Sequence, residues 1–205
     1  MNDSYVGIKI GSIALLLAMV LSYSMYVKKD IGSKLSDGHE LILKEMPDFS
    51  SSDFFNKDIE VSKKTVAATN DKVIFVHFWA TWCGPCEEEL PSFITLLDGW
   101  KASGVRGLLV AVQDNPEKMK NYLKRFGKMP KNITVIHDKT GEIMARFGTV
   151  KLPETYLFSA NFKNLNKYVG AQDWKLDRYN KRLNFYLSTE NVEKSDSVNY
   201  KIETH

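Results

Sequence analysis

Cysteine is scarce in this sequence. Cys83 and Cys86 are the whole cysteine content of its 205 residues, and the four histidines are scattered along the chain. A structural zinc site takes four Cys or His ligands, so the two cysteines lack the second half of such a site and we predict no bound metal. A single Cys-x-x-Cys pair is compatible with either a reducing or an oxidising compartment.

The sequence also lacks a strong net charge and internal repeats. The formal net charge is +3 and the basic residues are dispersed, which argues against a nucleic acid as partner. The length allows one ordinary domain with appendages. Residues 10–27 carry no charge, and about 18 to 20 apolar residues suffice to span a bilayer.

We expect residues 10–27 to be a single transmembrane anchor. A cleaved signal peptide with Leu15–Leu21 as its apolar region is the alternative, but no clear small-x-small cleavage site follows. A buried core helix is a further alternative, and the lack of a polar face argues against it. Lys9 precedes the segment while Lys28 and Lys29 follow it, so the positive charges do not settle its orientation.

The residues on either side of the cysteines predict a strand, a loop and a helix. Val73–Phe78 is an almost continuous apolar run, as in a central strand that is buried on both faces. We expect the helix to begin at Cys83, and Pro91 to kink it without ending it. Its buried stripe recurs at spacings of three and four residues and comprises Cys86, Leu90, Phe93, Leu97 and Trp100.

This placement gives the two cysteines different reactivities. The N-terminus of a helix carries partial positive charge, which stabilises a thiolate at the first cysteine. Cys86 lies inside the first turn, where burial keeps the thiol protonated until it reacts. The sequence therefore predicts an attacking Cys83 and a resolving Cys86 that together can close a small disulfide.

Strand and helix signals alternate along the rest of the chain. Asn115 is a predicted N-cap followed by Pro116, and Gly127 should come just after that helix. We expect Asp173 to cap the last helix, and Pro153 to open a strand because proline cannot donate to a sheet. Further predicted elements are strands Val105–Val112, Ile133–Ile136 and Lys167–Gly170, a short helix over 143–147, a hairpin turn at Phe162–Leu165, and Leu176, Tyr179, Leu183 and Leu187 as the apolar face of the last helix. This order predicts an α/β sandwich with parallel pairing in its first half.

The run Phe78-Trp-Ala-Thr-Trp-Cys-Gly-Pro-Cys86 is followed by Glu89-Leu-Pro91. This combination resembles the thioredoxin superfamily, and the similarity extends over residues 46–187. Within the superfamily, the sequence is most similar to the membrane-anchored TlpA/ResA-like thiol–disulfide oxidoreductases of bacteria. The resemblance implies a thioredoxin-like three-layer α/β/α sandwich with an N-terminal β-hairpin over Asp48–Ala67, preceded by a single transmembrane helix.

The resemblance also implies how the chain is divided. We expect a cytoplasmic N-terminus at 1–9, the anchor at 10–27, a linker at 28–45, the thioredoxin-like domain at 46–187 and a polar tail without regular structure at 188–205. Relatives carry this domain outside the cytoplasmic membrane. We therefore expect it to face the periplasm or the cell exterior.

Further residues gain a role from the family. Pro153 matches a proline that is cis and faces the disulfide, and a client strand can pair with the backbone beside it. For Glu154, a plain exposed acid is the alternative to partner selection. The Pro153-Glu-Thr155 sequence resembles the cytochrome c-maturation reductases, but their acidic insert is not evident before it. The residues expected to bind a client are Trp82, Gly84, Pro85, Leu152 and Glu154.

The family points to two acid–base candidates. Glu89 matches a glutamate that influences thiol protonation, and a solvated acid in the first helical turn is the alternative. His77 occupies the position of a buried aspartate that manages the proton of the second cysteine in thioredoxins. An imidazole there can accept that proton near neutral pH, or it is a packed strand histidine bonded to backbone.

The predicted function is reduction of client-protein disulfides through a Cys83/Cys86 dithiol–disulfide cycle, without a further cofactor. Gly84-Pro85 is the dipeptide of reducing thioredoxins, which work near about −270 mV. Because the chain has no further cysteine, electrons must come from another protein, and the family suggests a membrane thiol-transfer protein of the CcdA or DsbD type. A disulfide-introducing oxidase or isomerase and a thiol-based copper chaperone are the alternative functions.

Overall fold

The computed structural model describes residues 17–23, 25, 43–69, 71–188 and 203–204. The chain divides into two compact units, Met1–Ile42 and Leu43–His205. In the first unit, residues 17–23 and 25 are helical. Within the described residues, no helix has the length and apolar character needed to cross a bilayer. Most of the expected anchor and linker, and all of the expected cytoplasmic N-terminus, lie outside the described residues.

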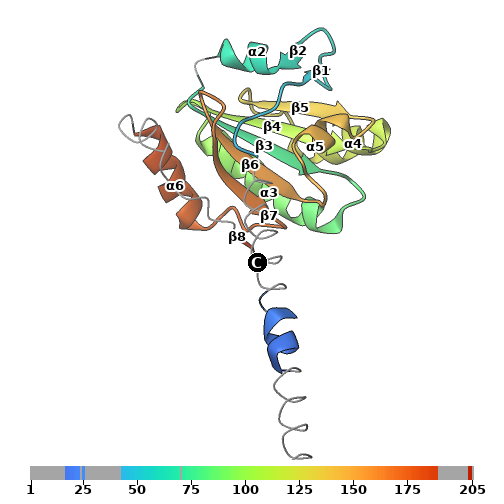
Figure 1. Ribbon diagram of the computed structural model, residues 1–205. Coiled ribbons are helices and arrows are strands. Elements are labelled where there is room, and N and C mark those ends of the chain that lie inside the picture. The colour runs from blue at the N-terminus through green and yellow to red at the C-terminus, as the bar shows by residue number, and fades with distance from the viewer. Residues whose placement is uncertain (1–16, 24, 26–42, 70, 189–202, 205) are drawn as a thin grey trace, which may run out of the picture. The chain divides into compact units, whose positions relative to one another are not determined.

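A mixed β-sheet forms the centre of the second unit (Figure 1). β3, β4 and β5 pair in parallel, whereas β6 runs antiparallel to β3 and β7 antiparallel to β6. The predicted parallel pairing is therefore confirmed. In sheet order, the strands are β5 (Ile133–Asp138), β4 (Val105–Val112), β3 (Val73–Trp79), β6 (Glu154–Ser159), β7 (Asn164–Val169) and β8 (Glu203–Thr204).

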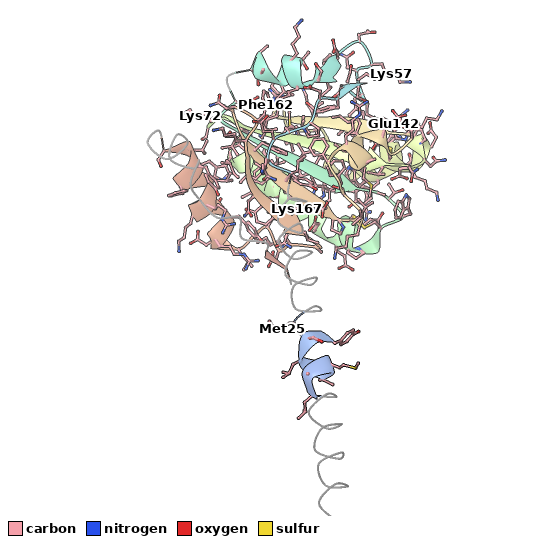
Figure 2. All side chains as sticks on the ribbon, in the orientation of Figure 1. Met25, Lys57, Lys72, Glu142, Phe162 and Lys167 are labelled. Carbon is pink, nitrogen blue, oxygen red and sulfur yellow. A yellow bond between two sulfur atoms is a disulfide. The ribbon has the colours of Figure 1, made fainter. Side chains whose placement is uncertain are left out.

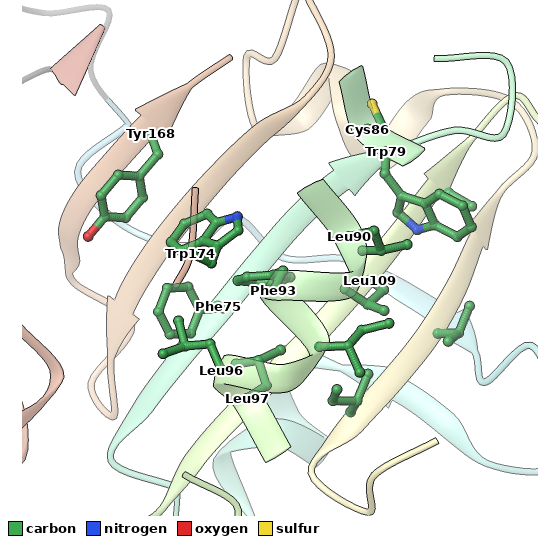
Figure 3. Close-up of a cluster of buried hydrophobic side chains, with 14 of the residues drawn as sticks. Phe75, Trp79, Cys86, Leu90, Phe93, Leu96, Leu97, Leu109, Tyr168 and Trp174 are labelled. Carbon is green, nitrogen blue, oxygen red and sulfur yellow. The ribbon is translucent and has the colours of Figure 1, made fainter. Parts of the chain in front are cut away.

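One face of the sheet is covered by α3 (Gly84–Gly99), α4 (Pro116–Leu123) and α6 (Asp177–Leu187). α3 links β3 to β4, and α4 links β4 to β5, so both connections step across the sheet in the same direction. Because crossovers between parallel strands are right-handed, the two helices lie on the same face. The predicted stripe of α3 points into this core, where Phe93 packs against Phe75 and Trp174 (Figure 3). α3 continues past Pro91 to Gly99, as the sequence indicated.

The opposite face is covered by the N-terminal hairpin, α2 (Lys63–Ala67) and α5 (Glu142–Arg146). The hairpin pairs β1 (Ser50–Ser52) with β2 (Glu60–Ser62), which confirms the hairpin prediction. It ends earlier than expected, because Ser62 and Thr65 form a capping box that starts α2. The ammonium of Lys63 lies 5.1 Å from the ring centre of Phe162, which is labelled in Figure 2.

Several element boundaries differ from the predictions. β7 begins at Asn164 within the expected turn, because the Asn164 side chain donates to the carbonyl of Leu43 and can be buried in a strand. α6 begins after Leu176, which is exposed, and Asp173 accepts from Lys175 in the preceding turn instead of capping the helix. α4 is capped by Asn115 as predicted, and the 3₁₀-helix η1 (Lys124–Phe126) extends it to Gly127.

The tail was expected to have no regular structure, and this is wrong for two residues. Glu203–Thr204 form β8, which pairs in parallel with Tyr168 and Val169 of β7. The outer edge of a sheet presents unpaired N–H and C=O groups that another segment can satisfy. The rest of the tail beyond Ser188 lies outside the described residues.

α3 packs closely against the sheet at Gly107 in β4. A Cβ atom added there would overlap the Cδ1 atom of Leu97, which is fully buried. Gly99 at the end of α3 has no neighbouring atom within 4 Å of such a Cβ. The two glycines therefore differ in the space that surrounds them.

We expect Gly107→Ala to lower the free energy of unfolding by about 1–3 kcal/mol, because the added methyl must displace a buried leucine. Gly99→Ala should leave it unchanged or raise it by up to about 1 kcal/mol, since alanine favours the helix. Urea denaturation of both variants in the oxidised state measures the difference. Equal unfolding midpoints would contradict the close packing.

Candidate functional site

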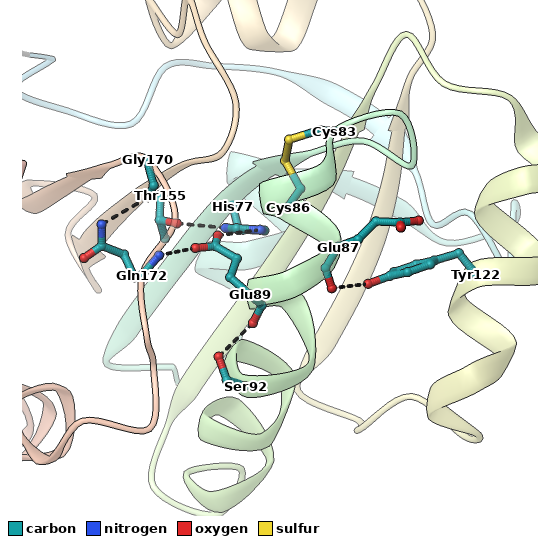
Figure 4. Close-up of polar contacts among 10 residues, drawn as sticks. All are labelled: His77, Cys83, Cys86, Glu87, Glu89, Ser92, Tyr122, Thr155, Gly170 and Gln172. Atoms are coloured by element: carbon teal, nitrogen blue, oxygen red, sulfur yellow. Dashed lines mark hydrogen bonds and ion pairs between the residues drawn. A yellow bond between two sulfur atoms is a disulfide. The ribbon is translucent and has the colours of Figure 1, made fainter. Parts of the chain in front are cut away.

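Cys83 and Cys86 form a disulfide where β3 leads into α3 (Figure 4). Cys83 is the N-cap residue of α3, and its carbonyl accepts the N–H groups of Cys86 and Glu87. Cys83 is 7% exposed and Cys86 is fully buried. Cys83 is thus the more accessible residue, although it is less exposed than expected. The attacking and resolving roles stay predictions that this geometry favours.

The residues expected to bind a client surround the disulfide in different ways. Trp82 is 61% exposed, and Gly84 and Pro85 are also exposed. The bond between Leu152 and Pro153 is cis, as the family resemblance implied. β6 starts immediately after Pro153 and pairs with β3, which places this proline beside the end of β3 that leads to the cysteines.

Glu154 does not fit the expectation of an exposed acid or a direct client contact. Its side chain is 2% exposed, and its Oε1 lies 3.0 Å from the ammonium of Lys167 in β7. An unpaired buried carboxylate would be strongly unfavourable, so the lysine compensates the charge. A client that reaches this segment would meet its backbone, because the carboxylate is already paired inside the protein.

The same network fixes the backbone that leads to Pro153. The hydroxyl of Tyr156 lies 2.8 Å from the carbonyl oxygen of Phe147 and 3.2 Å from Oε2 of Glu154. Thr149 donates to that hydroxyl, at 3.3 Å. Hydrogen bonds and an ion pair therefore connect residues on both sides of the cis proline to β6 and β7. Lys167 and Tyr156 were not predicted from the sequence as part of the site.

The loop before Cys83 is fixed by Asp114, which was also not predicted from the sequence as a site residue. Asp114 follows β4 and is 9% exposed. Its carboxylate accepts the backbone N–H and the hydroxyl of Thr81, and also the N–H of Asn115. Carboxyl ends of neighbouring parallel strands meet at one edge of a sheet. An acid just after β4 was therefore a usable signal for contact with the loop after β3.

His77 and Glu89 lie together beneath the first turns of α3 (Figure 4). Nε2 of His77 is 3.4 Å from Oε1 of Glu89, and the two side chains are 0% and 2% exposed. Nδ1 of His77 is 2.8 Å from the hydroxyl of Thr155, and Glu89 accepts the N–H of Gln172. The solvated-acid alternative for Glu89 is therefore wrong, and so is a histidine bonded to backbone.

Burial favours the neutral form of both side chains. Desolvation raises the pKa of Glu89 to about 8, and the hydrogen bond from the backbone amide of Gln172 opposes this rise only in part. Desolvation lowers the pKa of His77 to about 3. At neutral pH, the acid therefore keeps its proton and the imidazole is uncharged.

The site can perform thiol–disulfide exchange with the two sulfurs alone. In the part of the chain that the structure describes, no group of three or more His, Cys, Asp or Glu side chains is arranged to bind a metal ion. The cysteine pair can undergo nucleophilic attack between sulfurs, and His77 and Glu89 are nearby groups that can exchange a proton.

Comparisons with known proteins agree with this chemistry. The model of the AhpC/TSA family matches residues 42–163. The chain is 32% identical over 142 residues to the thiol-disulfide oxidoreductase ResA of Bacillus thuringiensis subsp. konkukian. This alignment covers 68% of this chain and 77% of that protein. It is 28% identical over 160 residues to ResA of Bacillus subtilis, in an alignment that covers 78% of this chain and 82% of that protein.

A solved structure shows the same fold. The thiol:disulfide interchange protein of the thioredoxin family from Chlorobium tepidum TLS superposes with a TM-score of 0.58 at 23% sequence identity. The superposition covers 71% of this chain and 97% of that chain. A likeness at this identity supports the thioredoxin-like α/β fold.

We expect Lys167→Met to lower the free energy of unfolding by about 2 kcal/mol, because it leaves the Glu154 carboxylate buried without its partner. Lys101→Met is the matched control, since Lys101 pairs with Asp98 on the exposed surface. Its effect should stay below about 1 kcal/mol. Equal losses in urea denaturation would show that the buried pair does not stabilise the segment that contains Pro153.

We expect the stability of the oxidised protein to depend on pH through Glu89 and His77. An unfolded glutamate titrates at 4.5 and an unfolded histidine at 6.5, compared with about 8 and about 3 in the folded protein. Between pH 4.5 and 6.5 the two contributions cancel, because folded and unfolded chains bind the same number of protons at these residues.

From pH 6.5 to 8, only the folded chain keeps the Glu89 proton, so the free energy of unfolding should fall by about 2 kcal/mol as pH rises. Below pH 4.5 it should fall as pH falls, because the unfolded histidine binds a proton that folded His77 rejects. Urea denaturation at each pH measures both slopes. Glu89→Gln should abolish the alkaline slope, and its persistence in that variant would assign the slope to other groups.

Proposed function

The chain belongs to the AhpC/TSA family and is a protein thiol–disulfide oxidoreductase with a thioredoxin-like fold, and on this basis we propose that it reduces disulfides in client proteins. The observation that carries the proposal is the unequal burial of Cys83 and Cys86 at the N-terminus of α3. A client disulfide can approach Cys83 while Cys86 stays protected. Gly84-Pro85, the dipeptide of reducing thioredoxins, supports the reductive direction.

The exchange proceeds in two displacements. The thiolate of reduced Cys83 attacks one client sulfur, the client S–S bond breaks, and the other client sulfur leaves as a thiolate that takes a proton from solvent. Cys86 then loses its proton, which the departing client sulfur takes up, and attacks the Sγ atom of Cys83. The mixed disulfide breaks, the second client sulfur leaves, and two electrons have passed from the cysteine pair to the client.

We place this activity on the outer side of the cytoplasmic membrane, with residues 10–27 as the anchor and the domain in the periplasm or at the cell exterior. The uncharged segment and the similarity to ResA proteins support this placement. An anchor raises the local concentration of the domain near other membrane proteins. We propose a membrane thiol-transfer protein of the CcdA or DsbD type as electron donor.

Cytochrome c maturation is the pathway that we propose for the clients. The support is the Pro153-Glu-Thr155 sequence, which resembles the reductases of that pathway. A c-type haem is attached at a Cys-x-x-Cys-His motif, which presents two closely spaced cysteines. The client would pair as an extended strand with the backbone beside Pro153 and present a sulfur to Cys83.

We expect Cys86→Ser to trap clients as mixed disulfides, because Cys83 can attack but nothing can release the adduct. The variant is expressed in its native membrane, free thiols are blocked, and adducts are compared with and without dithiothreitol on non-reducing gels. Mass spectrometry of the released proteins identifies the clients and their compartment together.

Cys83→Ser is the matched control, since it keeps a thiol in the same helix turn but lacks the proposed nucleophile. It should trap far fewer adducts than Cys86→Ser. Equal trapping by the two variants, or no adduct with either, would overturn the proposed roles of the cysteines. Adducts found only with cytoplasmic proteins would overturn the proposed location.

A further inference from the structure

Lysines from three separate loops gather at one end of the domain. Because β3, β4 and β5 run parallel, the segments that lead into them meet at one edge of the sheet. Lys72 precedes β3, Lys101 lies in the loop before β4, and Lys128 and Lys131 lie in the loop before β5. The N–H of Lys72 donates to the carbonyl of Gly104, which joins the first two loops. All four lysines are exposed, and we call them the basic end.

Most of the charge at the basic end is not neutralised by the domain itself. Lys101 pairs with Asp98 at 2.9 Å, and Asp71, the acid next to the first loop, is already paired with Arg106. Within the described residues, the lysines that make no ion pair are Lys72, Lys128 and Lys131. The basic end therefore presents three uncompensated ammonium groups to its surroundings.

Part of the basic end is hollowed. Lys101, Lys128 and Lys131 line a depression of about 450 Å³. Met129 and Pro130, which are half-buried, line it as well and place apolar surface between the ammonium groups. Surfaces that bind the interfacial layer of a membrane combine basic side chains with apolar ones in this way. Anionic phospholipid headgroups match both the charge and the apolar lining.

The chain enters the domain at this same end. Val73 at the start of β3 pairs with Ser159, so the turn between β6 and β7 lies beside the start of β3. Figure 2 labels Lys72 and Phe162 at this end. The N–H of Met46 donates to the carbonyl of Phe162, which places the first residues of the domain at the turn. The disulfide follows the other end of β3, about 20 Å away for a strand of seven residues.

The end of the domain that carries the disulfide has charges of both signs. Its exposed or half-buried acids at the starts of α3 and α4 are Glu87, Glu88 and Glu117. Its exposed lysines, at the start of α4, after β5 and before the cis proline, are Lys118, Lys139 and Lys151. A negatively charged surface therefore attracts the basic end more strongly than the disulfide end.

We propose that the basic end rests on a membrane surface containing anionic phospholipids and thereby holds the disulfide away from the bilayer. This inference rests on the anchor proposed above. Residues 28–42 connect that anchor to the domain and span at most about 50 Å, so the connection alone permits either end to face the bilayer.

The charge of the basic end is sufficient to select one orientation. One lysine near an anionic membrane surface favours binding about fivefold, so three uncompensated lysines favour it about 100-fold. Such binding would be weak for a free domain, but an anchored domain stays close to the surface at high local concentration. A client outside the membrane can then approach Cys83 without contacting the bilayer.

The test measures acetylation of individual lysines in the full chain by an uncharged N-hydroxysuccinimide ester and mass spectrometry. The chain is reconstituted in vesicles of phosphatidylcholine, or of phosphatidylcholine mixed with phosphatidylglycerol. We expect Lys128 and Lys131 to react at least about fivefold more slowly in the anionic vesicles. High salt should remove the difference, because it screens the attraction. Lys139 and Lys151 are internal controls that should react equally in both kinds of vesicle.

Two charge-matched double variants test which end binds. Lys128→Gln with Lys131→Gln should restore the acetylation of Lys72 and Lys101 in anionic vesicles, since one uncompensated lysine is left. Lys139→Gln with Lys151→Gln removes the same charge from the disulfide end and should keep the basic end protected. All four positions are exposed, so the substitutions leave the core intact.

Equal acetylation of Lys128 and Lys131 in the two kinds of vesicle would overturn the proposal, and so would stronger protection of Lys139 and Lys151. Protection that persists at high salt would assign it to contacts other than lipid charge. Retention of the chain on phosphatidylcholine vesicles after an alkaline wash tests the anchor separately. If the chain is lost there, the proposed anchor is wrong, and acetylation with anionic vesicles added in excess still decides whether the basic end binds lipid. The cysteines take no part in either measurement, so failure of client trapping is a separate result.

Discussion

The structure depends on placing one of two reactive sulfurs in a dry layer between a helix and a sheet. Cys86 lies on the buried side of α3 with no exposed surface, whereas Cys83 stays at the helix N-terminus. Everything polar that approaches Cys86 must then be neutral and partnered, because an uncompensated charge in that layer would be strongly unfavourable. His77 and Glu89 lie next to each other in this layer, and burial favours the neutral form of both side chains.

The two segments that border the disulfide are fixed from behind by side chains of the sheet. Asp114, just after β4, binds the loop that precedes Cys83. Glu154 and Lys167, on β6 and β7, fix the segment that carries Pro153. The geometry on both sides of the disulfide is therefore supported by polar contacts of buried side chains.

The local sequence was sufficient for most of the fold and for the centre of the site. β3 and α3 were predictable because apolar runs and helical stripes report directly on burial, and Asn115 was predictable because capping is a contact between near neighbours. The start of β7 and the cap of α6 were not. Asn164 belongs to a residue type that is common in turns, but its side chain is bonded to the distant backbone of Leu43. Asp173 was the expected cap, but α6 begins only after Leu176. Local sequence patterns do not contain this information.

The sequence by itself determined that two cysteines flank a Gly-Pro turn at a strand–helix junction, since this requires only residues that are adjacent in the chain. The tertiary structure alone decided which acids and bases surround them. His77, Glu89, Thr155 and Gln172 come from four separate segments, and burial after folding keeps His77 uncharged and holds on Glu89 a proton that a glutamate in neutral water has lost. Glu154 changed from an expected surface acid to a buried ion pair for the same reason, because desolvation depends on the neighbours that folding brings together.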